Sequence, residues 1–147
     1  FQSAKKPCLP EACKCIFIRM LKHKALATVL ERATTGGVKC AFLINQHGAL
    51  LASSGCYGMD KKEACVKAAL ASNIWSSTEK CGKLTFQEDD LELIMIECDG
   101  GKLAVTKVIN LLLCLQSESQ VGFGMLKAKM KALVEYLQPS LQNVITA

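Results

Sequence analysis

The segment Leu91–Cys98 constrains the fold most, because an extended chain of this sequence carries apolar side chains on both faces. Side chains alternate in direction along a strand. They therefore form two sets, with Leu91, Leu93 and Met95 on one face and Ile94 and Ile96 on the other. A sheet that contains such a strand has to be covered on both sides. Asp99-Gly100-Gly101 follows as a hairpin turn, since glycine accepts the positive φ angles that tight turns require.

Hydrophobic periodicity predicts the remaining elements. The expected strands are Val38–Asn45, Ala49–Ser53, Leu91–Cys98, Lys102–Lys107 and Ile109–Gln116, and the expected helices are 21–33, 60–80 and 126–138. Cys81-Gly82 is predicted to close the second helix, and Pro139 to disrupt the third. The order α-β-β-α-β-β-β-α predicts an α/β fold of the α+β type, in which helices sandwich a five-stranded, mostly antiparallel sheet.

The second predicted helix has an unusual stripe of small side chains. Its members are Ala64, Cys65, Ala68, Ala69, Ala71 and Ser72, with Ile74 and Trp75 adding bulk toward the end. Small side chains let another backbone approach closely. The helix could lie tight on its own sheet, or it could also pack against the equivalent helix of a partner, and the residues alone do not decide between these interpretations.

Length indicates one domain, and charge indicates that this domain lacks the strongly basic surface that binds nucleic acid. A chain of 147 residues fits a single domain. We expect residues 20–147 to form it and residues 1–19 to be a leader or a remnant of the expression vector. The leader holds four basic residues and Glu11, so the domain itself has a charge of only +2 out of the formal +5. Nucleic acid is therefore not an expected partner. The longest apolar runs are far shorter than the roughly 20 residues that span a bilayer.

The residue types that catalysis or metal binding needs are present but not arranged for either. Nine cysteines without a secretory signal are expected to stay reduced. The apolar patterns around Cys40, Cys65, Cys98 and Cys114 suggest core packing. No Cys-x-x-Cys pair occurs, and His23 and His47 lie in unrelated segments. We therefore predict no catalytic residue, no metal site and no cofactor, and interpret the chain as a binding module.

Several longer blocks resemble the roadblock/dynein light chain family. They are Thr35-Gly36-Gly37-Val38, Ala71-Ser72-Asn73-Ile74-Trp75, Asn110-Leu111-Leu112-Leu113-Cys114 and Val121–Lys129. The resemblance runs from Met20 to about Val144 and is strongest to the late endosomal and lysosomal adaptors of that family. It implies a roadblock/longin-like fold and a non-catalytic scaffold on the cytoplasmic face of late endosomes and lysosomes, held there by a lipidated partner subunit rather than by direct membrane insertion.

The resemblance also implies partners and an interface. The partners would be a roadblock-fold paralogue (subunit three of the adaptor), other Ragulator subunits and the Rag GTPases, in TOR and MAP kinase signalling. In such dimers the third strands pair and the second helices pack together. Carried onto this chain, the interface would use Leu91, Leu93 and Met95 on the strand and Cys65, Ala68, Ala69, Ser72 and Trp75 on the helix.

Two alternatives remain open. A homodimeric roadblock light chain of a dynein motor would share the fold, and this chain could also self-pair when its partner is absent. An enzyme-like regulation of a bound GTPase would require a presented arginine. Apart from Arg19 in the leader, the only arginine is Arg32 near a helix end, where a basic side chain complements the helix dipole.

Overall fold

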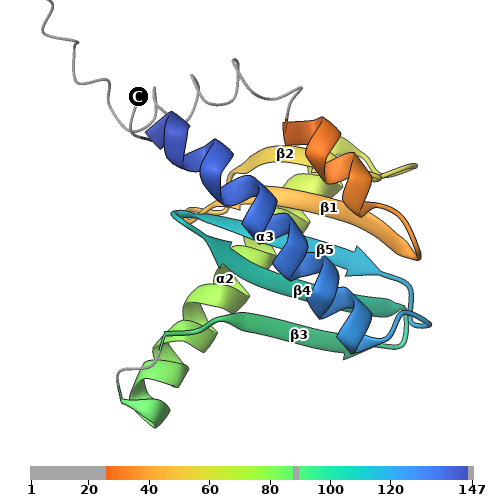
Figure 1. Cartoon of the computed structure of the whole chain (residues 1–147). Coiled ribbons are helices and arrows are strands. Elements are labelled where there is room, and N and C mark those ends of the chain that lie inside the picture. The colour runs from red at the N-terminus through yellow and green to blue at the C-terminus, as the bar shows by residue number, and fades with distance from the viewer. Residues whose placement is uncertain (1–25, 88–89, 146–147) are drawn as a thin grey trace, which may run out of the picture.

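The fold is an antiparallel sheet between two helical layers. The computed structural model describes residues 26–87 and 90–145. Its strands are β1 (Val38–Asn45), β2 (Leu50–Ser54), β3 (Leu93–Cys98), β4 (Gly101–Val108) and β5 (Leu111–Ser117), and they form one sheet in the order β2-β1-β5-β4-β3. Helix α2 (Lys61–Phe86) covers one face, while α3 (Phe123–Ile145) and a helix over residues 26–33 cover the other (Figure 1). This arrangement confirms the predicted α+β sandwich.

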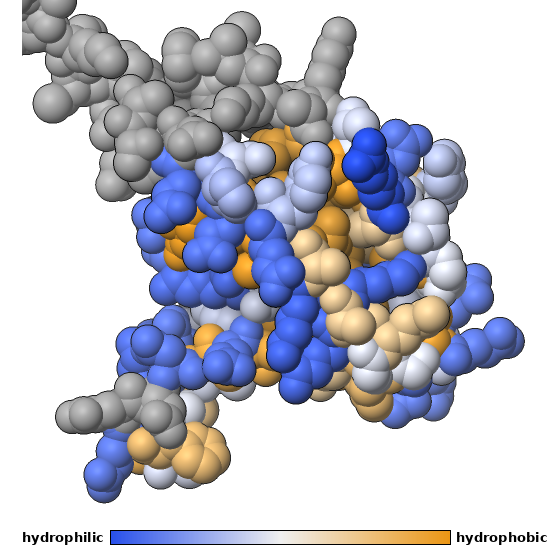
Figure 2. Space-filling model, viewed as in Figure 1, coloured by the Kyte–Doolittle hydropathy of each residue, from blue (hydrophilic) through white to orange (hydrophobic). Residues whose placement is uncertain are grey.

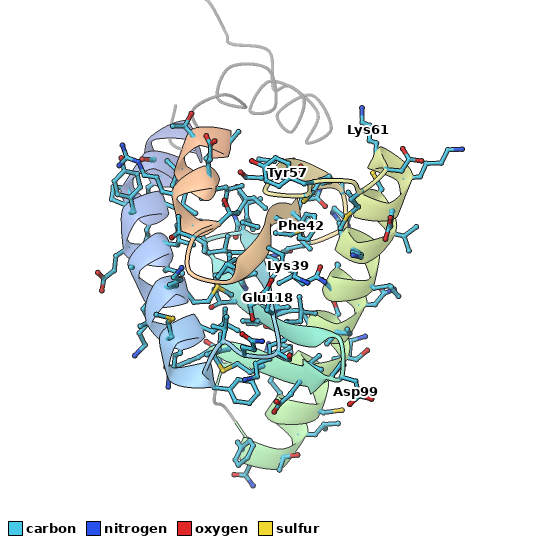
Figure 3. All side chains as sticks on the ribbon, turned by 90° about the vertical axis from the view of Figure 1, so that its right-hand side faces the viewer. Lys39, Phe42, Tyr57, Lys61, Asp99 and Glu118 are labelled. Atoms are coloured by element: carbon cyan, nitrogen blue, oxygen red, sulfur yellow. The ribbon has the colours of Figure 1, made fainter. Side chains whose placement is uncertain are left out.

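Each face of the sheet has its own hydrophobic core. In the central strand β5, Leu111, Leu113 and Leu115 point toward α3, whereas Leu112 and Cys114 point toward α2. All five are buried, which is the pattern expected of a strand covered on both sides. We call the two groups of side chains the α3-side core and the α2-side core. Figure 3 shows the sheet edge-on between the two layers, with Phe42 of the α2-side core labelled.

Helix α2 is longer than the sequence predicts. It runs through Cys81 and Gly82 to Phe86, and Gln87 ends it in the left-handed conformation with φ 60°. The Gln87 N–H donates to the Lys83 carbonyl at 3.1 Å, which caps the last turn. A glycine inside a helix costs only about 1 kcal/mol relative to alanine, so Gly82 weakens this helix without ending it. The prediction that Cys81-Gly82 closes the helix is therefore wrong.

Helix α3 likewise continues past Pro139, where a break was predicted. Pro139 is exposed, and the helix extends to Ile145. Leu137 and Leu141, on either side of the proline, are both buried against the sheet. Proline has no N–H and cannot donate the main-chain hydrogen bond of a helix. Burial of these two leucines offsets that loss and keeps the helix continuous.

Two apolar residues that the sequence interpretation placed in strands lie outside them. Ile109 is not in a strand, because it takes φ 58° and joins β4 to β5 together with Asn110. Leu91 precedes β3 and packs against the α2-side core, whereas Leu93 and Met95 pack against the α3-side core. The prediction that all three point to one face is wrong for Leu91, since strict alternation holds only inside the strand.

The predicted start of the first helix at residue 21 and the predicted boundary at residue 20 lie outside the described residues. Where the chain is described, no helix has both the length and the hydrophobicity that a membrane span requires.

A nearly buried lysine joins the β3–β4 hairpin to the start of α3. Lys102 Nζ donates to the Val121 carbonyl at 2.5 Å and lies 4.7 Å from the centroid of the Phe123 ring. It also lies 3.8 Å from a carboxylate oxygen of Glu97, directly across the hairpin. The ammonium group thus has three partners, which compensate for its removal from water.

Replacing Lys102 by methionine is expected to lower the free energy of unfolding by about 1–3 kcal/mol. Methionine keeps most of the apolar stem but leaves the Val121 carbonyl without its donor. Urea unfolding followed by circular dichroism measures the loss. Lys107→Met, at an exposed position of the same strand, is the matched control and should change stability by no more than about 0.5 kcal/mol. Equal stability of the two variants would contradict this role of Lys102.

Candidate partner-binding surface

Strand β3 forms one edge of the sheet. It pairs antiparallel with β4 from Leu93 opposite Thr106 to Cys98 opposite Gly101, and in the described chain no strand lies on its other side. An edge strand presents main-chain N–H and C=O groups that can pair with another strand. The opposite edge, β2, is shorter and pairs with β1 through an irregular register near Ile44. Strand β3 is therefore the better template for an added strand.

The side chains of β3 make that edge apolar on both faces. Ile94 is buried in the α2-side core, while Leu93, Met95 and Ile96 are half-buried. An apolar edge of this kind is an aggregation hazard unless something covers it. Leu93 and Met95, both predicted as interface residues, thus lie at the edge of the sheet with part of their surface open.

The five residues of helix α2 that were predicted for the interface fall into two groups, buried and exposed. Ala68, Ser72 and Trp75 are buried against the sheet of their own chain, each at most 5% exposed. Cys65 and Ala69 are exposed. The interpretation that the small residues let α2 lie tight on its own sheet is confirmed. The interpretation that α2 also packs against a partner stays a prediction, for which Cys65 and Ala69 supply accessible surface.

The turn between β1 and β2 gives a second reason for small side chains on α2. Ser72 Oγ donates to the Gln46 carbonyl of this turn at 2.9 Å. A Cβ atom on Gly48 would lie 3.1 Å from the Ala69 Cα, and Gly48 has φ 85°. The turn backbone therefore lies directly against the helix. Larger side chains at 69 or 72 would push the turn away.

The outer side of α2 carries apolar residues that the sequence reasoning missed. Val66, Leu70 and Leu84 are 57%, 54% and 86% exposed. At 100° per residue their spacing places them on one side of the helix, opposite the buried Ala68 and Trp75. We call Val66, Leu70 and Leu84 the outer stripe. The sequence could have indicated this stripe, because large aliphatic side chains interrupt the otherwise polar face of the helix.

The end of α2 brings this helix to the free edge of the sheet. Figure 1 shows the C-terminal part of α2 projecting past β3, and Figure 2 shows apolar side chains on that projecting end. Phe86, in the last turn, is 69% exposed there. The β3 edge and the outer stripe together define a candidate partner-binding surface, since large exposed apolar areas mark interaction sites.

Two ion pairs form along α2. Lys67 Nζ lies 3.7 Å from a Glu63 carboxylate oxygen, and Lys83 Nζ lies 4.0 Å from one of Glu79. Both pairs have the i,i+4 spacing, with the glutamate nearer the N-terminus, which is the favourable order. The helix holds five lysines and two glutamates, so α2 keeps a net positive charge beside these two pairs.

The cysteines of the described chain divide between core and surface. Cys40 and Cys114 are buried, as predicted, but Cys65 and Cys98 are exposed, so the prediction of core packing is wrong for these two. Burial raises the pKa of Cys114 to about 12, so this thiol stays protonated and is a poor nucleophile. Among the described residues, no three His, Cys, Asp or Glu side chains are grouped as metal ligands would be.

The fold is that of a known class of small α/β domain. The family model of the Roadblock/LC7 domain matches residues 24–117, and the chain belongs to this family. Among curated proteins, it is 30% identical over 128 residues to a Ragulator complex protein LAMTOR2 homolog of Caenorhabditis elegans, covering 85% of this chain and 96% of that protein.

Solved structures share the fold at lower sequence identity. MglB of Myxococcus xanthus superposes with a TM-score of 0.75 and 19% identity, covering 84% of this chain and 92% of that chain. A Roadblock/LC7 domain from Streptomyces avermitilis superposes with a TM-score of 0.72 and 21% identity, covering 79% and 97%. The five-stranded roadblock fold inferred from the sequence is therefore confirmed.

Proposed function

We propose that this chain is a non-catalytic adaptor subunit that pairs with a second roadblock-fold chain through the β3 edge and the adjacent side of α2. The free apolar β3 edge, together with the exposed apolar residues of α2, carries the proposal. Pairing two β3 strands would satisfy main-chain groups that are otherwise exposed, and would cover Leu93 and Met95. A durable complex of this kind buries on the order of 800 Å² per partner or more.

Similarity to a Ragulator complex protein supports a more specific role. On this similarity we assign the chain to a Ragulator-like complex on the cytoplasmic face of late endosomes or lysosomes, with a roadblock-fold paralogue as its direct partner. In that setting it would help to anchor Rag GTPases for TOR signalling and to scaffold MAP kinase signalling. A separate lipidated subunit would supply the membrane attachment.

The described residues favour scaffolding over catalysis. Burial keeps the Cys114 thiol protonated, and His47 is exposed in the β1–β2 turn. A nucleophile needs a neighbouring base, and a GTPase activator needs a presented arginine. The helix over residues 26–33, which carries Arg32 near its end, covers the face of the sheet opposite α2 (Figure 1).

Light scattering on the purified full chain tests the proposal, alone and mixed with the candidate paralogue. The expected result is a 1:1 complex that replaces both separate species. A chain that stays unchanged in mass beside the paralogue, and instead forms a stable dimer by itself, would overturn the heterodimeric role and favour a homodimeric light chain.

A further inference from the structure

Two cysteines from different elements lie together on the α2 side of the sheet. Cys40, in β1, is buried, and Cys56, in the loop between β2 and α2, is half-buried. Both belong to or pack against the α2-side core. The proposed pairing surface on β3 and the outer stripe of α2 uses neither of them.

The backbone at Gly55 brings the second thiol to the first. Ala41 pairs with Ser54, so continuing the register places Cys40 opposite Gly55. In a regular strand Cys56 would then point to the other face. Gly55 has φ 76°, and a Cβ atom on it would lie 2.4 Å from the Lys39 carbonyl oxygen. This close approach and the left-handed conformation end the strand and turn Cys56 back toward Cys40.

Each sulfur atom lies against a carbonyl group of the same short segment of backbone. Cys40 Sγ lies 3.9 Å from the Gly55 carbonyl oxygen, and Cys56 Sγ lies 3.5 Å from that of Ser54. Burial raises the pKa of Cys56 to about 12, with further contributions from a hydrogen bond to the Cys40 thiol and from its charge, while Lys67 acts in the opposite direction. The two thiols therefore lie on the same side of the sheet, beside the consecutive carbonyl groups of Ser54 and Gly55.

We propose that Cys40 and Cys56 are a reversible cross-link site, which a two-electron oxidant such as hydrogen peroxide closes into an intramolecular disulfide. The more accessible Cys56 sulfur attacks the peroxide: an S–O bond forms, the O–O bond breaks and water leaves. Cys40 then attacks the Cys56 sulfenic acid, so that the S–S bond forms and a second water leaves. A dithiol reductant returns both cysteines to thiols and is itself oxidised to its disulfide.

The cross-link ties the first part of β1 to the loop that leads into α2. Figure 3 shows Tyr57 of this loop at the end of the molecule that also holds Lys61, the first residue of α2. Because the thiolate is the attacking species, cross-linking should be slow at neutral pH and accelerate about tenfold per pH unit. The reduced pair is then the resting state in a reducing compartment.

Peptide mapping of the full chain after peroxide treatment tests the site. Trypsin cleaves after Lys39 and Lys61, so one peptide contains both cysteines. After denaturation and alkylation, the mass of this peptide should be that of the reduced peptide minus two hydrogens, with no alkyl group added. Cleavage after Phe42 should give two fragments that separate only with reductant. The unfolding midpoint of the oxidised chain should rise by several degrees and return with dithiothreitol.

Cys56→Ser and Cys65→Ser are the matched controls. The first should abolish the cross-linked peptide and the rise in unfolding midpoint, and the second should leave both intact. Exposed Cys81 and Cys98 report whether the oxidant has acted. If these two are oxidised while the peptide 40–61 remains fully alkylated, or if Cys56 is found joined to another cysteine, the proposal is overturned.

Discussion

Replacing Trp75 by alanine is expected to lower the free energy of unfolding by about 3–5 kcal/mol. The Trp75 side chain is 4% exposed and lies in the α2-side core with Ile94 and Val105. The small residues Ala68 and Ala71 of the same helix cannot move to fill the space that the indole would leave. The cost therefore combines lost apolar burial with a cavity. Urea unfolding of the isolated chain measures it.

Leu84→Ala is the control on the same helix. Leu84 is 86% exposed, so its truncation should change the stability of the isolated chain by no more than about 0.5 kcal/mol. A Trp75→Ala variant as stable as Leu84→Ala would show that α2 is not held on the sheet by this residue.

Leu93→Glu is expected to weaken binding of the roadblock-fold partner at least about 30-fold, which corresponds to the roughly 2 kcal/mol of an interface hot spot. A carboxylate at position 93 would lose its water of hydration between the two paired strands, and this desolvation is costly. Leu93 also contacts the α3-side core, so circular dichroism should first establish that the variant folds.

Leu70→Glu provides a second test that does not disturb the core. Leu70 is 54% exposed on the outer stripe, and its replacement should leave stability unchanged while weakening the partner complex. Tyr136→Glu, at a 56% exposed position of α3 on the other side of the sheet, should weaken it little. Isothermal titration calorimetry gives the affinity of the partner for the unaltered chain and for each of these two variants. Equal affinities for Leu70→Glu and Tyr136→Glu would exclude α2 from the interface.

The architecture was largely predictable because each element has a strong periodic pattern. Strand β1 matches its predicted bounds, and apolar residues on both faces of the sheet correctly indicated two covering layers. Element ends were less predictable, since they depend on tertiary packing. Leu137 and Leu141 hold α3 across Pro139, and the cap at Gln87 rather than Gly82 ends α2. Neither effect is visible in local sequence.

The candidate surface was only partly predictable. Alternation correctly placed Leu93 and Met95 together on one face of the edge strand. Leu91 lies before the strand and packs against the α2-side core instead. A stripe of small residues cannot by itself reveal which side of the helix it faces. The structure shows that Ala68 and Ser72 face the sheet, and that the accessible apolar residues of α2 are larger ones such as Leu70.

Amide hydrogen exchange, with and without the roadblock-fold partner, tests the central claim most directly. The two edges of the sheet, β3 and β2, serve as each other's control. Pairing through β3 predicts that amides of Leu93–Cys98 become protected in the complex, while those of Leu50–Ser54 exchange as before. Protection confined to β2, or a complex in which β3 exchanges as freely as in the isolated chain, would contradict the proposed mode of pairing.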